Sequence, residues 1–272
     1  MNKYLRNWML HSRIPWLRDL AIREIRRTHA KRHEQRQRAV FQLLCQAGES
    51  PRVLNGPFAG MVYLNEPVWG SITPRWLGSY ESCLHPVIRE IIAANYARVI
   101  DVGCAEGYYA VGLCRALPGA EVFAYDLDPE SRAQVLRLWE LNGRRGQLTV
   151  GGLLDHAELE RLARPRTLLM CDIEGGEMRL LDPARCEALK AMDVLVEVHH
   201  TGSITVAANA AGLRERFAAT HQITQIDESA NMASLENVQA LNADHLKEAM
   251  AEGRPYPQIW LWLKPRSSVP TA

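Results

Sequence analysis

The chain has 272 residues, of which 47% are hydrophobic and 23% are charged, with a formal net charge of +1. This composition supplies the core of one large domain or two small ones and excludes a disordered chain. No run of about 18 uncharged apolar residues occurs, and the N-terminus lacks a secretory signal pattern, so the sequence predicts a cytoplasmic globular protein without a transmembrane segment.

The N-terminal region is the most basic part of the sequence. Residues 1–40 hold eleven Lys/Arg and three Asp/Glu, a charge of +8, whereas the remainder carries −7. Apolar residues from 15 to 27 recur at helical spacing. We therefore predict a basic helical extension over residues 1–50. Its arginines could pack on the acidic body or on a partner subunit, or could bind an anionic membrane surface. Nucleic acid is disfavoured because no aromatic-interleaved motif accompanies them.

Residues 51–96 are predicted to form a lid or adaptor segment and an entry helix. Glycines and prolines with interspersed aromatic residues over 51–80 predict short strands and loops. The following stretch, "HPVIREIIAANY", is amphipathic, with Pro86 in its first turn. Tyr63, Trp69 and Trp76 could line an acceptor pocket, although packing in the core is the simpler interpretation.

Strand and helix signals alternate over residues 97–265, which we predict to be the main domain, followed by a tail at 266–272. Strands are predicted at Arg98–Val102, Glu121–Tyr125, Gln147–Val150, Thr167–Cys171, Val194–Val198, Ile223–Ile226 and Gln258–Leu263. Helices are predicted after Gly107 and at 128–142, 156–162, 182–192 and 209–219. The alternation indicates an α/β fold, a Rossmann-like, mostly parallel sheet with helices on both faces. Six cysteines without Cys-x-x-Cys spacing are interpreted as reduced, and no Cys/His quartet suggests zinc.

The stretch "RVIDVGCAEGYYAVGLCRALPGAEVFAYDLDP" (98–129) predicts a nucleoside-binding corner. Asp101 ends one strand, Gly103 permits a turn, and Gly107 lets the next helix begin close to a ligand. Asp126 ends the second strand, where its carboxylate can accept both hydroxyls of an adenosine ribose. In an open parallel sheet such ligands bind beyond the carboxyl ends of the strands.

The nature of the turn favours a cationic cofactor over a dinucleotide. A nicotinamide-binding turn has Gly-x-Gly-x-x-Gly, and here the middle glycine is missing. Asp101 and Glu106 are poorly suited to a pyrophosphate but fit the sulfonium and ammonium groups of S-adenosylmethionine. A tight strand–helix turn without a ligand is the simpler alternative.

The segment "DVGCAEGYYAVGL" (101–113) resembles the first motif of class I S-adenosylmethionine-dependent methyltransferases, especially the FkbM-like group. "CDIEGGEMRLLDP" (171–183) is similar to the acidic motif of that group and "VLVEVHH" (194–200) to its fifth strand, while "GPFAGMVY" and "LGSYESCLHPVI" resemble its upstream segments. The resemblance covers roughly residues 51–263. It implies a seven-stranded sheet with an antiparallel last strand, Asp126 on the ribose, and methyl transfer. The predicted cofactor-binding residues are Asp101, Gly103, Cys104, Ala105, Glu106, Gly107, Tyr108, Asp126, Leu127 and Glu81. Of these, Glu81 is predicted to be part of a cover over the amino-acid end of the cofactor.

Candidate catalytic groups follow the fourth and fifth strands. Side chains alternate along a strand, so Glu197 and His199 share a face and could converge with Asp172. In one interpretation His199 is a general base oriented by Asp172 or Glu174. In a second, Asp172, Glu197 and His199 bind a divalent cation that activates the acceptor hydroxyl. In a third, Glu174 and Glu177 only bind loop N–H groups and His200 caps the strand.

The sequence thus predicts an S-adenosylmethionine-dependent methyltransferase that acts on a hydroxyl of a sugar or a secondary metabolite. No Asn/Asp-Pro-Pro-Tyr tetrapeptide follows the fourth strand, which disfavours amino acceptors, and no Pro-Cys pair suggests pyrimidine carbon-5 chemistry. A nucleotide-binding oxidoreductase and a non-catalytic scaffold with the same fold are the alternatives.

Overall fold

The computed structural model describes residues 40–42, 45, 50–66, 68, 70–227, 235–236, 238, 242–253 and 259–266. The predicted basic arm, apart from a few residues after position 39, lies outside the described residues, as do Trp69 and all of the tail except Arg266. No described helix combines the length and apolar character that a bilayer span requires.

A seven-stranded sheet with the order β3-β2-β1-β4-β5-β7-β6 forms the centre of the molecule. Strands β1 to β5 are parallel, and β7 runs antiparallel to both of its neighbours, β5 and β6. The predicted mostly parallel sheet with an antiparallel last strand is therefore confirmed. The strands are β1 Arg98–Val102, β2 Glu121–Tyr125, β3 Gln147–Gly151, β4 Thr167–Cys171, β5 Asp193–Val198, β6 His221–Asp227 and β7 Ile259–Pro265.

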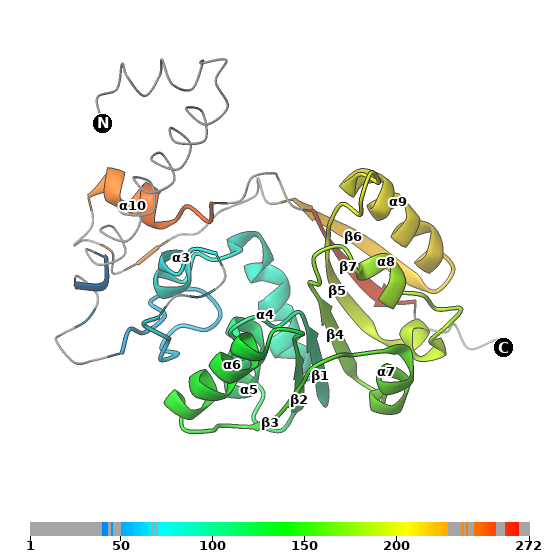
Figure 1. Cartoon of the computed structure of the whole chain (residues 1–272), viewed down its shortest axis with the longest axis horizontal. Helices are drawn as coiled ribbons and strands as arrows, with labels where there is room; N and C mark the ends of the chain where they lie inside the picture. Colours follow the sequence, from blue (N-terminus) through cyan, green and yellow to red (C-terminus); the bar gives the residue numbers. More distant parts are fainter. Residues whose placement is uncertain are drawn as a thin grey trace, which may run out of the picture.

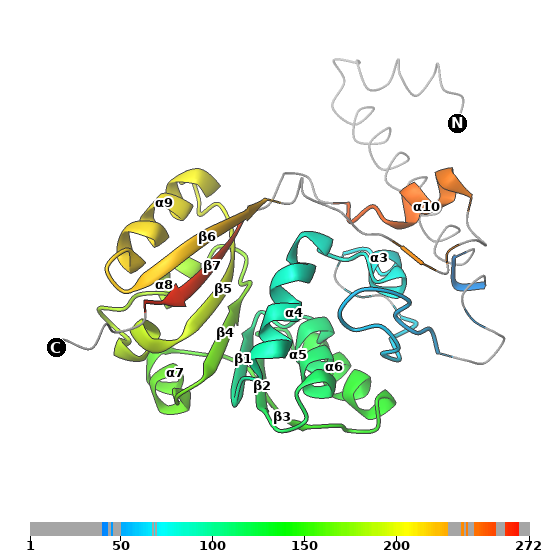
Figure 2. The ribbon, with the colours of Figure 1, turned by 180° about the vertical axis from the view of Figure 1, so that it is seen from behind.

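Helices cover both faces of the sheet, as predicted (Figures 1 and 2). One face carries α4 His85–Ala94, α5 Tyr108–Ala116 and α6 Pro129–Leu141. The other carries α7 His156–Leu162, α8 Glu177–Leu180 and α9 Val206–Phe217. Helices α3 Thr73–Leu77 and α10 Ala243–Ala249 contact each other beside the α4–α6 layer.

Local capping explains where several helices begin. The Asp128 side chain accepts the Glu130 N–H, and Pro129 occupies the first turn of α6, as predicted. The Thr205 side chain accepts the Ala208 N–H. Because of this cap, α9 begins earlier than the predicted residue 209.

Two predictions of local structure were wrong. No α-helix lies over the predicted range 182–192: a turn and the 3₁₀ helix η2 Glu187–Ala191 take its place, and the preceding helix α8 ends at Leu180. Asp182, which was expected inside that helix, bonds the Ala184 N–H with its side chain, a local contact that favours a turn. Within 51–80, where only strands and loops were expected, α3 forms, and the strand pairing is reduced to one bridge between Arg52 and Val62.

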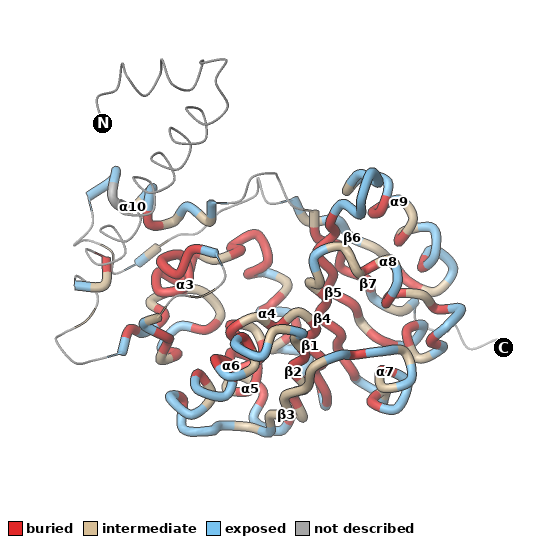
Figure 3. Tube along the Cα trace, viewed as in Figure 1, coloured by how far each residue is buried: buried red, intermediate tan, exposed pale blue. Residues whose placement is uncertain are grey.

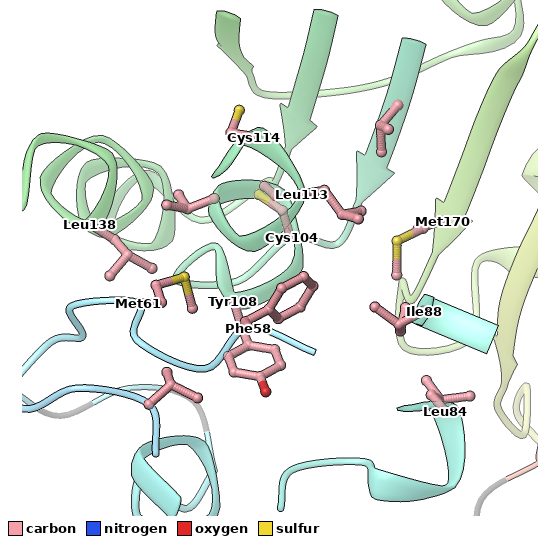
Figure 4. Close-up of a cluster of buried hydrophobic side chains, with 14 of the residues drawn as sticks. Phe58, Met61, Leu84, Ile88, Cys104, Tyr108, Leu113, Cys114, Leu138 and Met170 are labelled. Atoms are coloured by element: carbon pink, nitrogen blue, oxygen red, sulfur yellow. The ribbon is translucent and has the colours of Figure 1, made fainter. Parts of the chain in front are cut away.

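The core lies on the two faces of the sheet, whose central strands are buried throughout (Figure 3). On the α4–α6 side, the segment after residue 50 shares this core. Phe58 packs edge-on against Tyr108 of α5, with ring centroids 5.3 Å apart (Figure 4). Tyr63 and Trp76 are buried there too, so they belong to the core and not to an acceptor pocket. None of the six cysteines forms a disulfide bond.

The strand order places the functional loops together. β1 lies between β2 and β4, with β5 next to β4, and all four run in the same direction. Their carboxyl ends therefore meet at one edge of the sheet, where the chain leaves β1 and β4 in different directions. Such an edge is where ligands bind in open α/β sheets.

Candidate cofactor and acceptor site

The turn after β1 is closed against the residue that follows β4. Gly103 has φ of 81°, and a Cβ added there would lie 1.5 Å from the carbonyl oxygen of Asp172. A left-handed backbone in contact with another backbone requires glycine. The N–H groups of Gly103 and Cys104 donate to the Tyr125 carbonyl at 2.8 and 3.1 Å. The turn is thus fixed between the ends of β2 and β4.

Gly107 precedes α5 with φ of 96°. A Cβ there would meet the Val135 methyl groups of α6 at 3.2 Å. Glycine is therefore required here by the backbone conformation and by the packing of α6. The sequence had instead suggested the close approach of a ligand as the reason. At the start of α5, the Ala110 N–H donates to the carboxyl group of Asp101. The N-terminus of α5 therefore already binds an acidic side chain of the protein itself.

Asp126 braces the turn after β1. Its Oδ2 accepts the Ala105 N–H at 2.9 Å, and its Oδ1 accepts the Asp128 N–H at 2.8 Å. Ala105 has φ of 45°, which this contact helps to hold. Each carboxylate oxygen can accept a further hydrogen bond. Asp126 also lines the large cleft described below, so the predicted ribose contact is compatible with its position.

A small cavity of about 40 Å³ lies beside the turn and is lined by acids. Oδ2 of Asp101, Oδ1 of Asp172 and the hydroxyl of Tyr108 are buried there without a hydrogen-bond partner among the described residues. Burial raises the pKa of Asp101 to about 8, and the charges of Asp172 and Asp126 add to the shift. Buried polar atoms are normally paired. This set is therefore suited to a ligand that brings hydrogen-bond donors or positive charge.

Glu106 takes part in a buried ion pair. Its Oε1 lies 2.5 Å from Arg75 Nε and accepts the Tyr63 hydroxyl at 2.5 Å. The Arg75 guanidinium also lies 4.0 Å from the ring centroid of Tyr80. The charge of Glu106 is therefore balanced inside the protein, which the sequence did not indicate, although the residue still lines the small cavity. Its predicted contact with a cofactor stays a prediction.

Glu81, the predicted cover residue, and its neighbour Tyr80 are placed differently from each other. Tyr80 lines both the small cavity and the cleft, whereas Glu81 lines neither. Glu81 is 2% exposed, accepts the Tyr109 hydroxyl, and donates its backbone N–H to Glu252. Tyr80 is thus the residue of this pair that a bound molecule would contact directly.

A cleft of about 1850 Å³ runs along the carboxyl ends of the parallel strands. Ligand pockets for single small molecules occupy roughly 300–1,000 Å³, so this cleft has room for two molecules. Its walls include residues at and just after the ends of the five parallel strands, among them Gly103, Ala105, Asp126, Leu127, Leu153, Asp172, Glu174, Glu197, His199 and His200.

Two leucines give the cleft an apolar patch. Leu127 is 74% exposed and Leu153 is 61% exposed, and they follow the ends of β2 and β3. Exposed leucines at the edge of a cleft provide a surface on which a flat ring can pack. Leu127 was among the predicted residues. Leu153 was missed, although its position directly after Gly151 and Gly152 was a usable signal.

Acidic side chains gather where β4 and β5 end. The Glu197 carboxyl hydrogen-bonds to that of Asp172, which requires that the pair hold a proton. Burial raises the pKa of Asp172, and the charge of Glu81 raises it further. The predicted meeting of the two acids at the end of the sheet is thus observed.

His199 lies at the centre of this group. Its ring is buried, and Nδ1 lies 2.9 Å from Oε1 of Glu177. Its Nε2 faces oxygens of Asp172 at 3.6 Å, Glu174 at 3.5 Å and Glu197 at 3.8 Å. Burial alone would lower the pKa of His199, but the Glu177 hydrogen bond and the charges of Asp172, Glu177 and Glu174 raise it above its ordinary value.

Glu177 is the partner that the sequence analysis did not assign to His199. Its Oε1 also accepts the N–H groups of Gly175 at 3.0 Å and Ile173 at 3.3 Å. The expectation that Glu177 bonds loop N–H groups is confirmed, but the same oxygen also bonds the imidazole. Asp172 and Glu174, which were expected to orient the ring, lie on its other nitrogen.

Asp172, Glu174 and His199 could also hold a metal ion. Their ligand atoms lie within 4.8 Å of one another. Glu174 takes the place that Glu197 had in the predicted set, and its side chain is 86% exposed. Carboxylates suit a hard divalent cation, for which histidine is an atypical ligand.

Comparisons with known proteins give partial matches. No protein-family model matches the chain. A release factor glutamine methyltransferase of Deinococcus radiodurans is 38% identical over 74 residues, which are 27% of this chain and 27% of that protein. The chain therefore matches about a quarter of the length of this curated relative.

Solved structures of methyltransferases resemble the chain at low scores. An O-methyltransferase of Bacillus cereus, in complex with S-adenosylhomocysteine, has a TM-score of 0.44 at 14% identity, over 69% of this chain and 80% of that one. An rRNA methylase of Streptococcus thermophilus has a TM-score of 0.41 at 12% identity, over 67% and 96%. The fold assignment rests on the strand order itself.

Proposed function

We propose that the protein is an S-adenosylmethionine-dependent methyltransferase that methylates a hydroxyl group of a small-molecule acceptor, such as a sugar or a secondary metabolite. The observation that carries the proposal is the acidic cradle at the turn after β1. Buried oxygens of Asp101 and Asp172 lie there without hydrogen-bond partners among the described residues. A cofactor with a sulfonium and an ammonium group supplies the missing charge and donors, whereas a pyrophosphate would be repelled.

The residues around the cradle fit the rest of that cofactor. Asp126 keeps free acceptor capacity for ribose hydroxyls, and Leu127 and Leu153 offer an apolar surface for a purine ring. The glycine at 103 fixes the turn because no side chain fits against Asp172. The cofactor supplies a methyl group on a positively charged sulfur, and transfer forms an O–CH₃ bond while the S–CH₃ bond breaks and leaves a neutral thioether.

The acceptor end of the cleft contains the group that would receive the proton. With Nδ1 bonded to Glu177, the Nε2 of His199 is directed toward Asp172 and Glu174. An acceptor hydroxyl placed at Nε2 would lose its proton to His199 as the new bond forms. Asp172 would then stabilise the resulting imidazolium. His199 is thus the proposed general base and Asp172 its electrostatic partner.

Calorimetric titration with S-adenosylhomocysteine tests the cofactor assignment. We expect binding that is measurable at micromolar to millimolar ligand. Transfer of a labelled methyl group from the cofactor to small-molecule fractions of a cell extract tests the reaction, and His199→Ala should abolish it. Absence of binding at millimolar ligand would contradict the proposal, and labelling that goes only to RNA or protein would contradict its acceptor class.

A further inference from the structure

We propose that Glu177 is a positioning residue for His199: it fixes the imidazole with its proton on Nδ1, so that Nε2 is left to accept the proton of the acceptor. This inference rests on the proposed methyl transfer. The inference goes beyond that reaction by assigning a role to Glu177, an acid that does not line the cleft.

The connection between β4 and α8 brings Glu177 to the ring. β4 and β5 are adjacent and parallel, so the loop after β4 lies beside the end of β5, where His199 is. Glu177 is the first residue of α8 and is 1% exposed. The distance of 2.9 Å between its Oε1 and Nδ1 of His199 is that of a hydrogen bond between buried groups.

The direction of this hydrogen bond follows from the other contacts of Glu177. Oε1 accepts two backbone N–H groups, those of Gly175 and Ile173. An oxygen that accepts two N–H groups has no proton of its own to donate, so Nδ1 is the donor of the hydrogen bond to Oε1.

A further contact fixes the backbone of His199. The Asn209 side chain is buried, and its Nδ2 donates to the His199 carbonyl at 2.7 Å. Nε2 is the only ring nitrogen directed at the cleft, toward Asp172, Glu174 and Glu197. Among the described residues, the acids that face His199 are therefore these three and Glu177, and Glu177 alone of them bonds the nitrogen that points away from the cleft.

The alternative is that Glu177 merely holds the loop between β4 and α8 together. Thr201 provides the matched control, since its hydroxyl donates to the Gly175 carbonyl at 3.1 Å and so holds the same loop. Among the described residues Thr201 makes no hydrogen bond to the imidazole ring, and its hydroxyl also accepts Nδ2 of Asn209 at 3.1 Å. Thr201→Val removes a contact of that loop but leaves the partner of Nδ1 in place.

The experiment follows the ring nitrogens of His199 by long-range ¹H–¹⁵N correlation spectra of the full-length protein. The protein has nine histidines, so the signal is assigned by its loss in His199→Ala. In the wild type we expect Nδ1 to stay protonated while Nε2 titrates. In Glu177→Gln we expect the pKa of His199 to fall by about 1 unit and the second tautomer to appear. Thr201→Val should keep the wild-type pattern.

Rates provide the functional measurement. At saturating labelled cofactor and a fixed amount of the extract fraction, Glu177→Gln should reduce the initial rate about 10- to 100-fold. Its affinity for S-adenosylhomocysteine should stay within about twofold, because Glu177 lines neither the small cavity nor the cleft. Glu177→Asp keeps the charge but loses reach and should give an intermediate rate.

Three results would overturn the inference. The first is a wild-type spectrum in which the proton of neutral His199 is on Nε2. The second is a Glu177→Gln variant whose ring signals and rate are unchanged. The third is a Thr201→Val variant that shows the same changes as Glu177→Gln. Failure of the wild type to bind S-adenosylhomocysteine would instead contradict the proposed function. The two failures are distinguishable because the ring spectra require neither cofactor nor acceptor.

Discussion

A Cβ atom on Gly103 would lie 1.5 Å from the backbone carbonyl oxygen of Asp172. The turn that forms the cofactor end of the cleft is thus in backbone contact with the first residue of the acceptor end. Asp172 in turn donates its N–H to the Val102 carbonyl at 2.9 Å, directly before that glycine. The two halves of the site are fixed to each other by main chain, not by long side chains.

Gly103→Ala should therefore damage both halves. We expect a loss of stability of at least about 2 kcal/mol, because a left-handed residue and a backbone overlap are both forced on the turn. Thermal or urea unfolding measures it. Gly119→Ala is the control, since a Cβ there meets nothing within 4 Å. Equal stability of the two variants would show that the turn can move away from Asp172.

Asp126→Ala should weaken binding of S-adenosylhomocysteine about 10- to 100-fold. The substitution removes the proposed ribose acceptor and also releases the Ala105 N–H from its partner. Calorimetric titration measures the loss. Asp182→Ala, which also removes an acid that bonds a backbone N–H but does not line the cleft, should leave the affinity unchanged. An unchanged affinity in Asp126→Ala would contradict the cofactor assignment.

Asp101→Asn should stabilise the protein while it weakens cofactor binding. Burial, with the charges of Asp172 and Asp126, raises the pKa of Asp101 from 3.8 to about 8 in the folded state. The folded state therefore binds the proton more tightly, and this acid costs stability as the pH rises from about 4 to about 8. Urea unfolding at both pH values should show that the substitution raises the free energy of unfolding by on the order of 2 kcal/mol more at pH 8 than at pH 4. A gain that is the same at both pH values would show that Asp101 is ionised when folded.

The rate of methyl transfer should rise with pH in the range where His199 loses its proton. A base must be neutral to act. Burial lowers the pKa of His199, but the hydrogen bond that its Nδ1 donates to Glu177 and the charges of nearby acids raise it above the ordinary 6.5. The acidic limb of the profile should therefore lie above pH 6.5. His199→Ala should remove the limb and lower the rate about 100-fold or more. A limb below pH 6 would contradict the assignment of His199 as base.

Removal of divalent cations should leave the rate unchanged. The proposed base needs its Nε2 free, and Glu174, one of the three candidate ligands, is 86% exposed. The measurement is the labelled-methyl assay with EDTA, followed by readdition of Mg²⁺ or Mn²⁺. The outcome could instead be that EDTA lowers the rate, that added cation restores it, and that the rate of the Asp172→Asn variant does not respond to the cation. That outcome would assign Asp172, Glu174 and His199 to a metal site.

Several elements of the site could be predicted from local sequence. The turn at 103–107 follows from an apolar strand, a glycine that can take a positive φ, and a helix that begins directly after the second glycine. The convergence of Glu197 and His199 follows from strand alternation. Glu106 shows the limit of this reasoning, because the buried Arg75 that neutralises it is 31 residues earlier in the chain. Nothing in the spacing indicates that contact.

The sequence by itself determined the alternation of strands and helices, the glycine turn and the acids at the strand ends, since these depend on periodicity and on backbone preferences of neighbouring residues. Only the tertiary structure decided which nitrogen of His199 faces the cleft, that Glu177 holds the other one, and that Glu81 lies outside the cleft. Those outcomes depend on which strands are adjacent and on which charges are buried together, and neither is encoded in local spacing.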